Sequence, residues 1–369
     1  LGSDDWRESE YCQQQIVTWA RRQVFRVGFD EARIAWNAGK NDDAFDIMMR
    51  RMEEMASIEV ATADRGWFFE ELPDRQIRRA TSAAGDDYFP FGIDRIDKAM
   101  NGGLHYGELE IPVAYSGVGK TFWCVQRGFI ASRLRRRVLH FVLEGGRTKI
   151  EDRYEARFAD ALYSDIRVGR LDSSTATALR LEYEMLRSNL VLRGYGDKQQ
   201  WRITYDDLLQ EMSELRRAHG WVPDMVIVDY GDLLHAPGDS SYEQQKMSFR
   251  QLKALAERKE KRGHPGYAVC SPSQAQRPAK GADEREHVIK PQQIADSYEK
   301  VRVADVIITL NRTAKEKARE EARVYLGKYR DSEDGVLVRV QTSYSKGAFC
   351  EIGVELELDA NPDAGEDDE

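Results

Sequence analysis

The chain has 369 residues and a net charge of −9. This acidic balance argues against a broad basic surface for nucleic acid but does not exclude a local basic channel. The length suits one large α/β domain with a smaller element. The four cysteines lie far apart without metal-ligand spacing, which indicates reduced thiols. No signal-peptide pattern or run of about 18 apolar residues occurs, so we expect a cytoplasmic protein without a membrane partner.

Residues 1–61 are predicted to form a small helical N-terminal segment. Apolar residues recur at spacings of three and four from about Asp42 to Ile58. This seam consists of Phe45, Met48, Met52 and Met55. Such a seam most often packs within its own domain, and docking on a neighbouring subunit is the alternative. Residues 62–88, which include a run of small and polar types, are predicted to be a linker.

Residues 89–358 have the pattern of one α/β domain. Short apolar runs alternate with helical patterns, which is typical of a mostly parallel sheet. The predicted strands are 109–113, 138–143, 190–192, 225–229, 266–271, 306–310, 324–329 and 336–344. Glu110 and Pro112 are poor residues for a central strand, and Pro cannot donate to the ladder. The acidic end, 359–369, is predicted to be disordered.

A phosphate-binding loop is predicted at residues 114–121, Ala-Tyr-Ser-Gly-Val-Gly-Lys-Thr, with Ala114 in place of the usual first glycine. A strand precedes it and a helical pattern follows, which favours this interpretation over a chance Gly-Lys-Thr. Backbone N–H groups and the positive end of the helix would surround a polyphosphate. Lys120 would reach the β and γ phosphates, and the hydroxyl of Thr121 would hold Mg²⁺. The predicted nucleotide-binding residues are Ser116, Gly117, Val118, Gly119, Lys120 and Thr121.

Three polar residues follow predicted strands and are candidates for the same site. Asp229 ends an apolar strand, where a carboxylate orients Mg²⁺, although strand ends also use Asp as a turn residue. Glu144 would orient the attacking water and accept its proton, and a surface glutamate is the alternative. Gln274 is a candidate sensor of the γ-phosphate.

The ordered set of motifs resembles the RecA-type ATPase core. It is most similar to the hexameric DnaB-type replicative DNA helicases, particularly phage-like members. The matching segments are 91–97, 102–104, 107–109, the phosphate loop, 141–144 with the catalytic glutamate, 228–234 with the Mg²⁺ aspartate, 273–277 with the Ser-Gln sensor and 328–330 with the Lys-x-Arg element. The resemblance covers about residues 89–350. Pro112 and Pro272 depart from it, because the family prefers apolar strand residues there.

The resemblance implies a ring, a hexamer in this family, that couples ATP hydrolysis at subunit interfaces to movement along single-stranded DNA and duplex unwinding in replication. ATP and Mg²⁺ are the implied cofactors, with Thr121 and Asp229 at the metal. The implied catalytic residues are Lys120, Glu144, Gln274, Lys328 and Arg330, the last acting in the neighbour's site. The implied location is the cytoplasm of a bacterial or phage-infected cell.

DNA contacts are implied for loops that face the central pore. The candidates are Arg277, Lys280, Ser297 and Lys300. Acidic residues at 283, 284 and 286 leave a plain solvated loop as the alternative. The first 88 residues do not resemble the usual N-terminal domain of the family. Primase and a helicase loader, which bind members of the family, are therefore candidate partners, but this segment gives no support for them.

Two other functions fit part of the pattern. One is a RecA- or KaiC-like recombination or regulatory ATPase that forms filaments or rings without unwinding. The other is a nucleotide-dependent DNA-binding scaffold or loader with weak hydrolysis. The presence of both Glu144 and Arg330 argues against the scaffold, which needs neither residue.

Overall fold

The computed structural model describes residues 5–57, 76, 88–195, 203–259, 265–275, 288–291, 298–331, 334–343 and 345–355. The chain divides into two units, Leu1–Thr81 and Ser82–Glu369, which we describe separately. The predicted linker at 62–88 lies outside the described residues except for 76 and 88, and the predicted tail at 359–369 lies wholly outside them. Among the described helices, none has the length and apolar character needed to cross a membrane.

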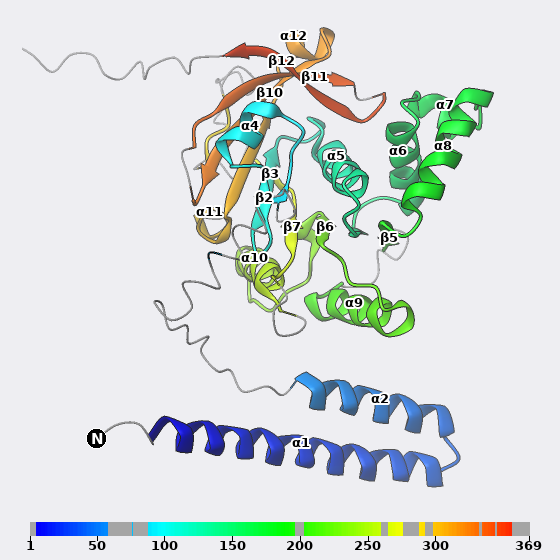
Figure 1. Cartoon of the computed structure of the whole chain (residues 1–369), viewed down its shortest axis with the longest axis vertical. Helices are drawn as coiled ribbons and strands as arrows, with labels where there is room; N and C mark the ends of the chain where they lie inside the picture. Colours follow the sequence, from blue (N-terminus) through cyan, green and yellow to red (C-terminus); the bar gives the residue numbers. More distant parts are fainter. Residues whose placement is uncertain are drawn as a thin grey trace, which may run out of the picture. The chain divides into compact units, whose positions relative to one another are not determined.

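The first unit contains a hairpin of two antiparallel helices, α1 (Asp5–Asn37) and α2 (Asn41–Ser57) (Figure 1). The helix predicted from Asp42 is therefore confirmed. The side chain of Arg51 of α2 packs on Gly28 of α1. A Cβ atom added at Gly28 would lie 2.5 Å from this side chain. Arg51 also pairs with Glu31 at 2.9 Å. The apolar seam is only partly covered, because Phe45 remains 71% exposed.

The second unit is built on a ten-stranded sheet with the order β12-β11-β10-β9-β3-β7-β6-β4-β5, and β8 also pairs with β3. The strands are β3 (Leu109–Ala114), β4 (Val138–Val142), β5 (Leu190–Gly194), β6 (Met225–Asp229), β7 (Ala268–Cys270), β8 (Ser273–Gln274), β9 (Val306–Asn311), β10 (Glu321–Tyr329), β11 (Leu337–Ser343) and β12 (Ala348–Glu355). From β5 to β9 the neighbours are parallel, and β10, β11 and β12 extend the sheet in antiparallel fashion. A short β1 (Tyr88–Phe89) pairs with β2 (Leu104–His105). The predicted strands are confirmed, and β1, β2, β8 and β12 were not predicted.

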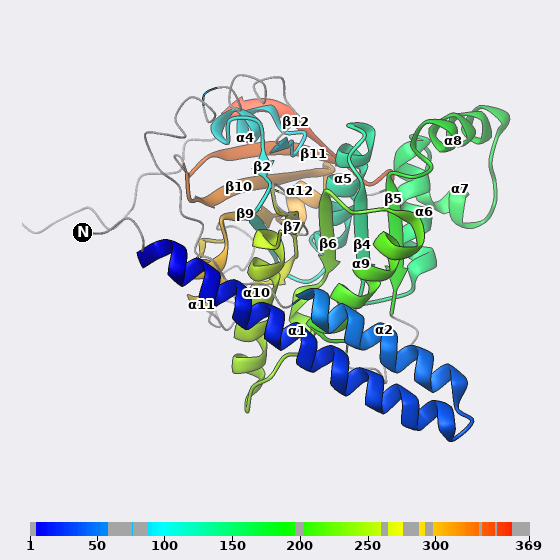
Figure 2. The same cartoon turned by 60° about the horizontal axis from the view of Figure 1, so that its bottom comes forward.

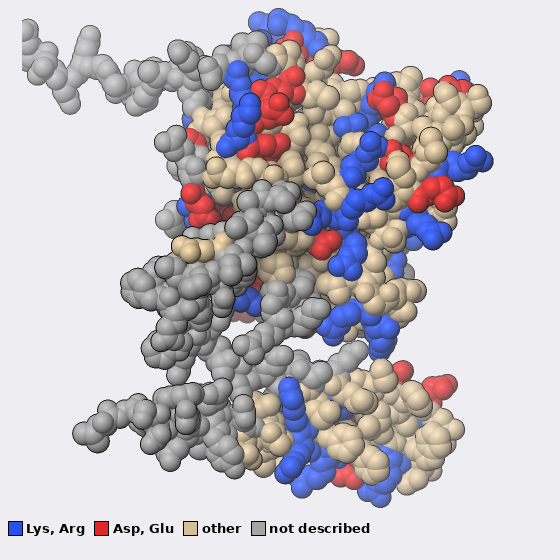
Figure 3. Space-filling view, viewed as in Figure 1, with Lys and Arg blue, Asp and Glu red and all other residues tan. Residues whose placement is uncertain are grey.

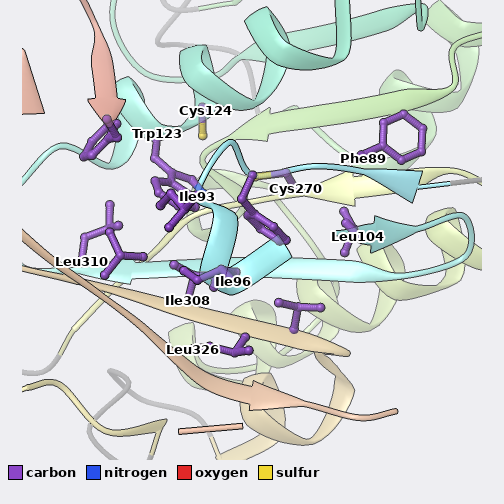
Figure 4. Packing of buried hydrophobic residues seen from close by; sticks show 14 of the residues in the cluster. Phe89, Ile93, Ile96, Leu104, Trp123, Cys124, Cys270, Ile308, Leu310 and Leu326 are labelled. Atoms are coloured by element: carbon purple, nitrogen blue, oxygen red, sulfur yellow. The ribbon is translucent and has the colours of Figure 1, made fainter. Parts of the chain in front are cut away.

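Helices cover both faces of the sheet (Figures 1 and 2). They are α4 (Asp94–Ala99), α5 (Lys120–Arg133), α6 (Arg147–Phe158), α7 (Tyr163–Arg167), α8 (Ser173–Leu186), α9 (Tyr205–His219), α10 (Ser241–Glu257), α11 (Tyr298–Val303) and α12 (Ala314–Ala318), with a 3₁₀ turn η2 at Gly231–Leu233. Successive residues of a strand point to opposite faces. One set packs with α4 and α5, where Figure 4 shows Trp123 among the apolar side chains. The other set packs with α9 and α10.

Glu110 is accommodated within β3 by an ion pair with α5. Its carboxylate lies 2.9 Å from Nε of Arg127 and accepts a second hydrogen bond, at 2.6 Å, from the indole N–H of Trp123. The side chains of Glu110 and Arg127 are both fully buried. A buried charge requires such pairing, and here it also fastens the strand before the phosphate loop to the helix after it.

Pro112 is accommodated by a break in the neighbouring strand. The carbonyl groups of Glu110 and Ala114 accept hydrogen bonds from the chain segment that contains β7 and β8. Because residues of a strand alternate between their two neighbours, the N–H that Pro112 lacks would face the same segment. At that level the chain passes from β7 to β8 through Ser271 and Pro272, which belong to neither strand.

Candidate active site

The phosphate loop connects β3 to α5 and leaves the helix start uncapped. Gly117 and Gly119 have φ angles of 77° and 119°, in the left-handed region that glycine adopts easily. No side chain caps the first turn of α5, so its N–H groups are available to an anion. Val118 is turned inward and packs with the core below the loop. The loop therefore has the backbone that a polyphosphate site requires.

The side chain of Lys120 folds back over its own loop. Nζ lies 3.1 Å from the carbonyl oxygen of Ala114, the last residue of β3. Burial lowers the pKa of Lys120, and the nearby carboxylates of Asp232, Asp229 and Glu144 raise it in opposition. A cation surrounded by carboxylates at the mouth of the loop is placed where the phosphates of a nucleotide would lie.

Asp229, the last residue of β6, is in contact with Thr121, the second residue of α5. Asp229 is 3% exposed and accepts a hydrogen bond from the Thr121 side chain. Burial raises the pKa of Asp229 to about 6, and the Thr121 hydrogen bond, Arg153 and Lys120 oppose this shift. The described residues contain no group of three or more His, Cys, Asp or Glu that could hold a metal by itself. One carboxylate and one hydroxyl fit Mg²⁺, which takes most of its ligands from water and phosphate.

Glu144 and Gln274 lie at the same edge of the sheet. Glu144 follows β4, the neighbour of β6, and is exposed; its charge acts on Lys120, Asp229 and Tyr230. Gln274 pairs with Ala114 in the register between β8 and β3. The carboxyl ends of parallel strands are where sheets of this kind bind ligands. The structure thus brings the predicted nucleotide and water-positioning residues together.

Two further residues support this edge and were not predicted. The hydroxyl of Ser271 donates to the carbonyl of Val228 and accepts from the N–H of Gly231, both at 2.9 Å. It thereby ties the end of β7 to the turn that follows Asp229. Arg312, after β9, donates to the carbonyl of Gly117 within the phosphate loop at 3.1 Å. A serine or arginine at a strand end carries no local signal of such contacts.

Lys328 and Arg330 lie at the opposite end of the parallel strands, near the residue where β3 begins. Tyr329 is level with Val306, and Val306 is level with Glu110 near the start of β3. The phosphate loop begins four residues further along, a separation of about 13 Å along the strand. Lys328 donates to the carbonyls of Val301 and Ala304 at 2.7 and 2.6 Å, and burial lowers its pKa. The structure therefore separates both residues from the phosphate loop of their own chain.

The structure corrects the prediction that Lys300 contacts DNA. Lys300 is 1% exposed, and its ammonium group donates to Asp232, to Gln245 at 2.9 Å and to Ser273 at 3.0 Å. A buried ammonium with three protein acceptors is not available to a DNA phosphate. Arg277, Lys280 and Ser297 lie outside the described residues. On the face of the second unit in Figure 3, described basic and acidic side chains are interspersed.

Residues 89–348 match the model of the DnaB-like helicase C-terminal domain family. The chain belongs to this family. The chain is accordingly an ATP-hydrolysing DNA helicase of the DnaB-like type. A comparison with curated proteins finds no match.

Two solved structures show the RecA-like fold of this DnaB-like chain. One is the structure of a DnaB-like replicative helicase, described with its interactions with primase. It has a TM-score of 0.68 and 17% identity, and the match covers 95% of this chain and 80% of the other. The second is the ATPase domain of a phage helicase, with a TM-score of 0.64 and 21% identity over 80% of this chain and 100% of the other. The predicted α/β fold class is confirmed.

Proposed function

We propose that the chain assembles as a ring, a hexamer by analogy with its family, around single-stranded DNA and moves along it to unwind duplexes in replication. One observation carries this proposal: Arg330 lies near the start of β3, and the phosphate loop follows the end of the same strand. An arginine that is fixed about 13 Å along the strand from its own loop can reach a nucleotide only in another subunit. A ring repeats this contact at every interface.

In this arrangement one subunit binds ATP through its phosphate loop, with Lys120 at the β and γ phosphates. Thr121 and Asp229 would hold Mg²⁺, which neutralises charge on the phosphates when it is bound. Glu144 would orient a water molecule and accept its proton, and Gln274 would contact the γ-phosphate. Arg330 of the adjacent subunit would stabilise the charge that develops during transfer, with Lys328 beside it.

Hydrolysis would alter the interface and move the DNA-contacting residues along the strand. Arg277 and Lys280, with Ser297, remain the proposed contacts on the DNA backbone. Helix α2 would dock on a neighbour and keep the ring closed during these shifts, since part of its apolar seam is exposed. Primase, which is described with the matched replicative helicase, is the first partner that we propose to test, and a helicase loader is the second.

Electron microscopy of the full chain with a non-hydrolysable ATP analogue and an oligonucleotide tests this proposal, together with unwinding of a forked duplex. We expect closed rings with one DNA strand in the pore and unwinding with a single polarity. Rings or filaments that hydrolyse ATP without unwinding would favour the RecA- or KaiC-like function. DNA binding that needs nucleotide but not hydrolysis would favour the scaffold or loader.

A further inference from the structure

A buried ion pair lies beside the nucleotide site and has no part in the proposed chemistry. The ammonium group of Lys300, on α11, donates to Oδ1 of Asp232 in the turn η2. The side chains of the two residues are 1% and 11% exposed. Gln245 and Ser273 supply two further acceptors at 2.9 and 3.0 Å, so all three N–H bonds of the ammonium group are used.

This pair is linked to the group that holds Lys120 through the adjacent strands β8 and β3. Ser273, which Lys300 contacts, is paired with Val113 in the register between β8 and β3. The next residue of β3, Ala114, offers the carbonyl oxygen to which Nζ of Lys120 donates. Asp232 is paired with Lys300, and its charge also acts on Lys120. Its second oxygen, Oδ2, is buried and has no hydrogen-bond partner among the described residues.

The charges around Lys120 make this arrangement consequential. Asp232, Asp229 and Glu144 all act on the Lys120 ammonium, and Asp232 has the largest effect of the three. A bound nucleoside triphosphate adds several further negative charges beside Lys120. If Asp232 had no cation of its own, it would repel the phosphates and attract Lys120. Each effect would weaken nucleotide binding.

We propose that Lys300 is a positioning residue that neutralises Asp232, so that Lys120 remains available to the phosphates of the nucleotide. The proposal rests on the nucleotide site of the proposed function and adds a residue that touches neither nucleotide nor metal. It requires no ring and no DNA. Lys300 acts through Asp232, and the pair sets the charge of the site rather than only holding the fold.

Nucleotide affinity of the full chain tests this proposal. We would measure binding of a non-hydrolysable ATP analogue, ADP and adenosine to the wild type, Lys300→Met, Asp232→Asn and the double variant, at constant Mg²⁺. Lys300→Met should bind the ATP analogue about tenfold more weakly, as expected for one uncompensated charge near the phosphates. ADP should lose less affinity, and adenosine none. The double variant should return to within about threefold of the wild type.

Asp232→Asn provides a measurement of the opposite sign. It removes a negative charge and keeps the shape of the side chain, so it should bind the ATP analogue at least as tightly as the wild type. Arg95→Met is a matched control, because it removes a partly buried ion pair with Glu351 between α4 and β12. That variant should keep wild-type affinity for all three ligands. Thermal unfolding of each variant would show that it is folded.

Several outcomes would overturn the proposal. They are unchanged affinity in Lys300→Met, equal losses for adenosine and the ATP analogue, a double variant at least as weak as Lys300→Met, and weaker binding in Asp232→Asn. If Lys300→Met fails to fold, the sign of the change in Asp232→Asn still decides. Failure of the nucleotide site itself would look different, because the wild type would then not bind the ATP analogue.

Discussion

Arg330 and Asp305 form an ion pair in which Nη1 of the guanidinium lies 3.0 Å from Oδ1 of the carboxylate. Asp305 is 4% exposed and accepts a second hydrogen bond, at 2.8 Å, from the backbone N–H of Leu109. The guanidinium is thereby fixed at the start of β3, although 48% of the Arg330 side chain remains exposed. An exposed arginine that is already ordered loses little conformational freedom when it meets a partner.

Arg330→Ala should bind nucleotide almost normally and hydrolyse it about 10³–10⁵-fold more slowly, because the charge that stabilises the transition state is lost. Mixing tests whether Arg330 acts between subunits. Lys120→Ala subunits have an intact Arg330, and Arg330→Ala subunits have an intact phosphate loop. When subunits exchange, the two inactive proteins should together recover part of the ATPase rate.

Arg302→Ala is the matched control, because Arg302 lies near the same edge and its side chain is 62% exposed. It should keep near-normal hydrolysis. No recovery on mixing, under conditions where labelled subunits are seen to exchange, would mean that Arg330 does not act across an interface.

Glu144→Gln should bind ATP with near wild-type affinity and hydrolyse it about 10²–10⁴-fold more slowly, because only the proton acceptor is lost. Single-turnover hydrolysis and nucleotide binding would be measured on the same protein. Glu184→Gln, at an exposed position of α8, is the control. A fully active Glu144→Gln would mean that another group accepts the proton.

His140 predicts how stability depends on pH. Its Nδ1 lies 2.9 Å from the hydroxyl of Tyr154, and burial lowers its pKa from 6.5 to about 3. Between these two values the unfolded chain binds a proton that the folded chain does not, so this contribution to stability falls as the pH falls below about 6.5. From pH 7 to pH 5 the loss should be about 2 kcal/mol.

His140→Gln cannot titrate in this range and should lose correspondingly less stability on acidification. Denaturant unfolding of both proteins at pH 7, 6 and 5 would check this. Parallel stability curves for the two proteins would mean that His140 does not contribute.

Replacing Arg277 and Lys280 with Ala should weaken binding of single-stranded DNA. Log affinity decreases with log salt concentration, and this dependence should become shallower by about 0.7 for each lost phosphate contact. Lys300→Met should leave this slope unchanged, because Lys300 is buried. An unchanged slope in the double alanine variant would remove both residues from the DNA-binding surface.

Local sequence patterns were sufficient to predict most strands of the large sheet, helix α2, the helix after the phosphate loop and the edge of the sheet where Lys120, Asp229 and Glu144 meet. These features depend on periodicity and on the order of strand ends, which a single sequence contains. The partner of Glu110 could not be predicted in the same way. Arg127 follows it by 17 residues and reaches it only because α5 folds back over β3.

Lys300 shows the same limit at the site. Its position at the end of a loop that the family resemblance places at the central pore implied an exposed DNA contact. Its burial depends on Asp232, which precedes it by 68 residues, and on Gln245 and Ser273 from two other elements. Charge in a sequence indicates where a cation could act, but only the packed structure shows whether that cation faces solvent or a carboxylate.

The buried guanidinium of Arg127 also forms a mechanical connection. Besides Glu110, it donates to the backbone carbonyls of Phe89 and Pro90, at the entrance to the second unit. The first residues of the second unit and α5, the helix that starts with Lys120, are therefore held by the same buried side chain. Loss of this one side chain would therefore loosen both the entrance of the chain into the second unit and the attachment of α5 to β3.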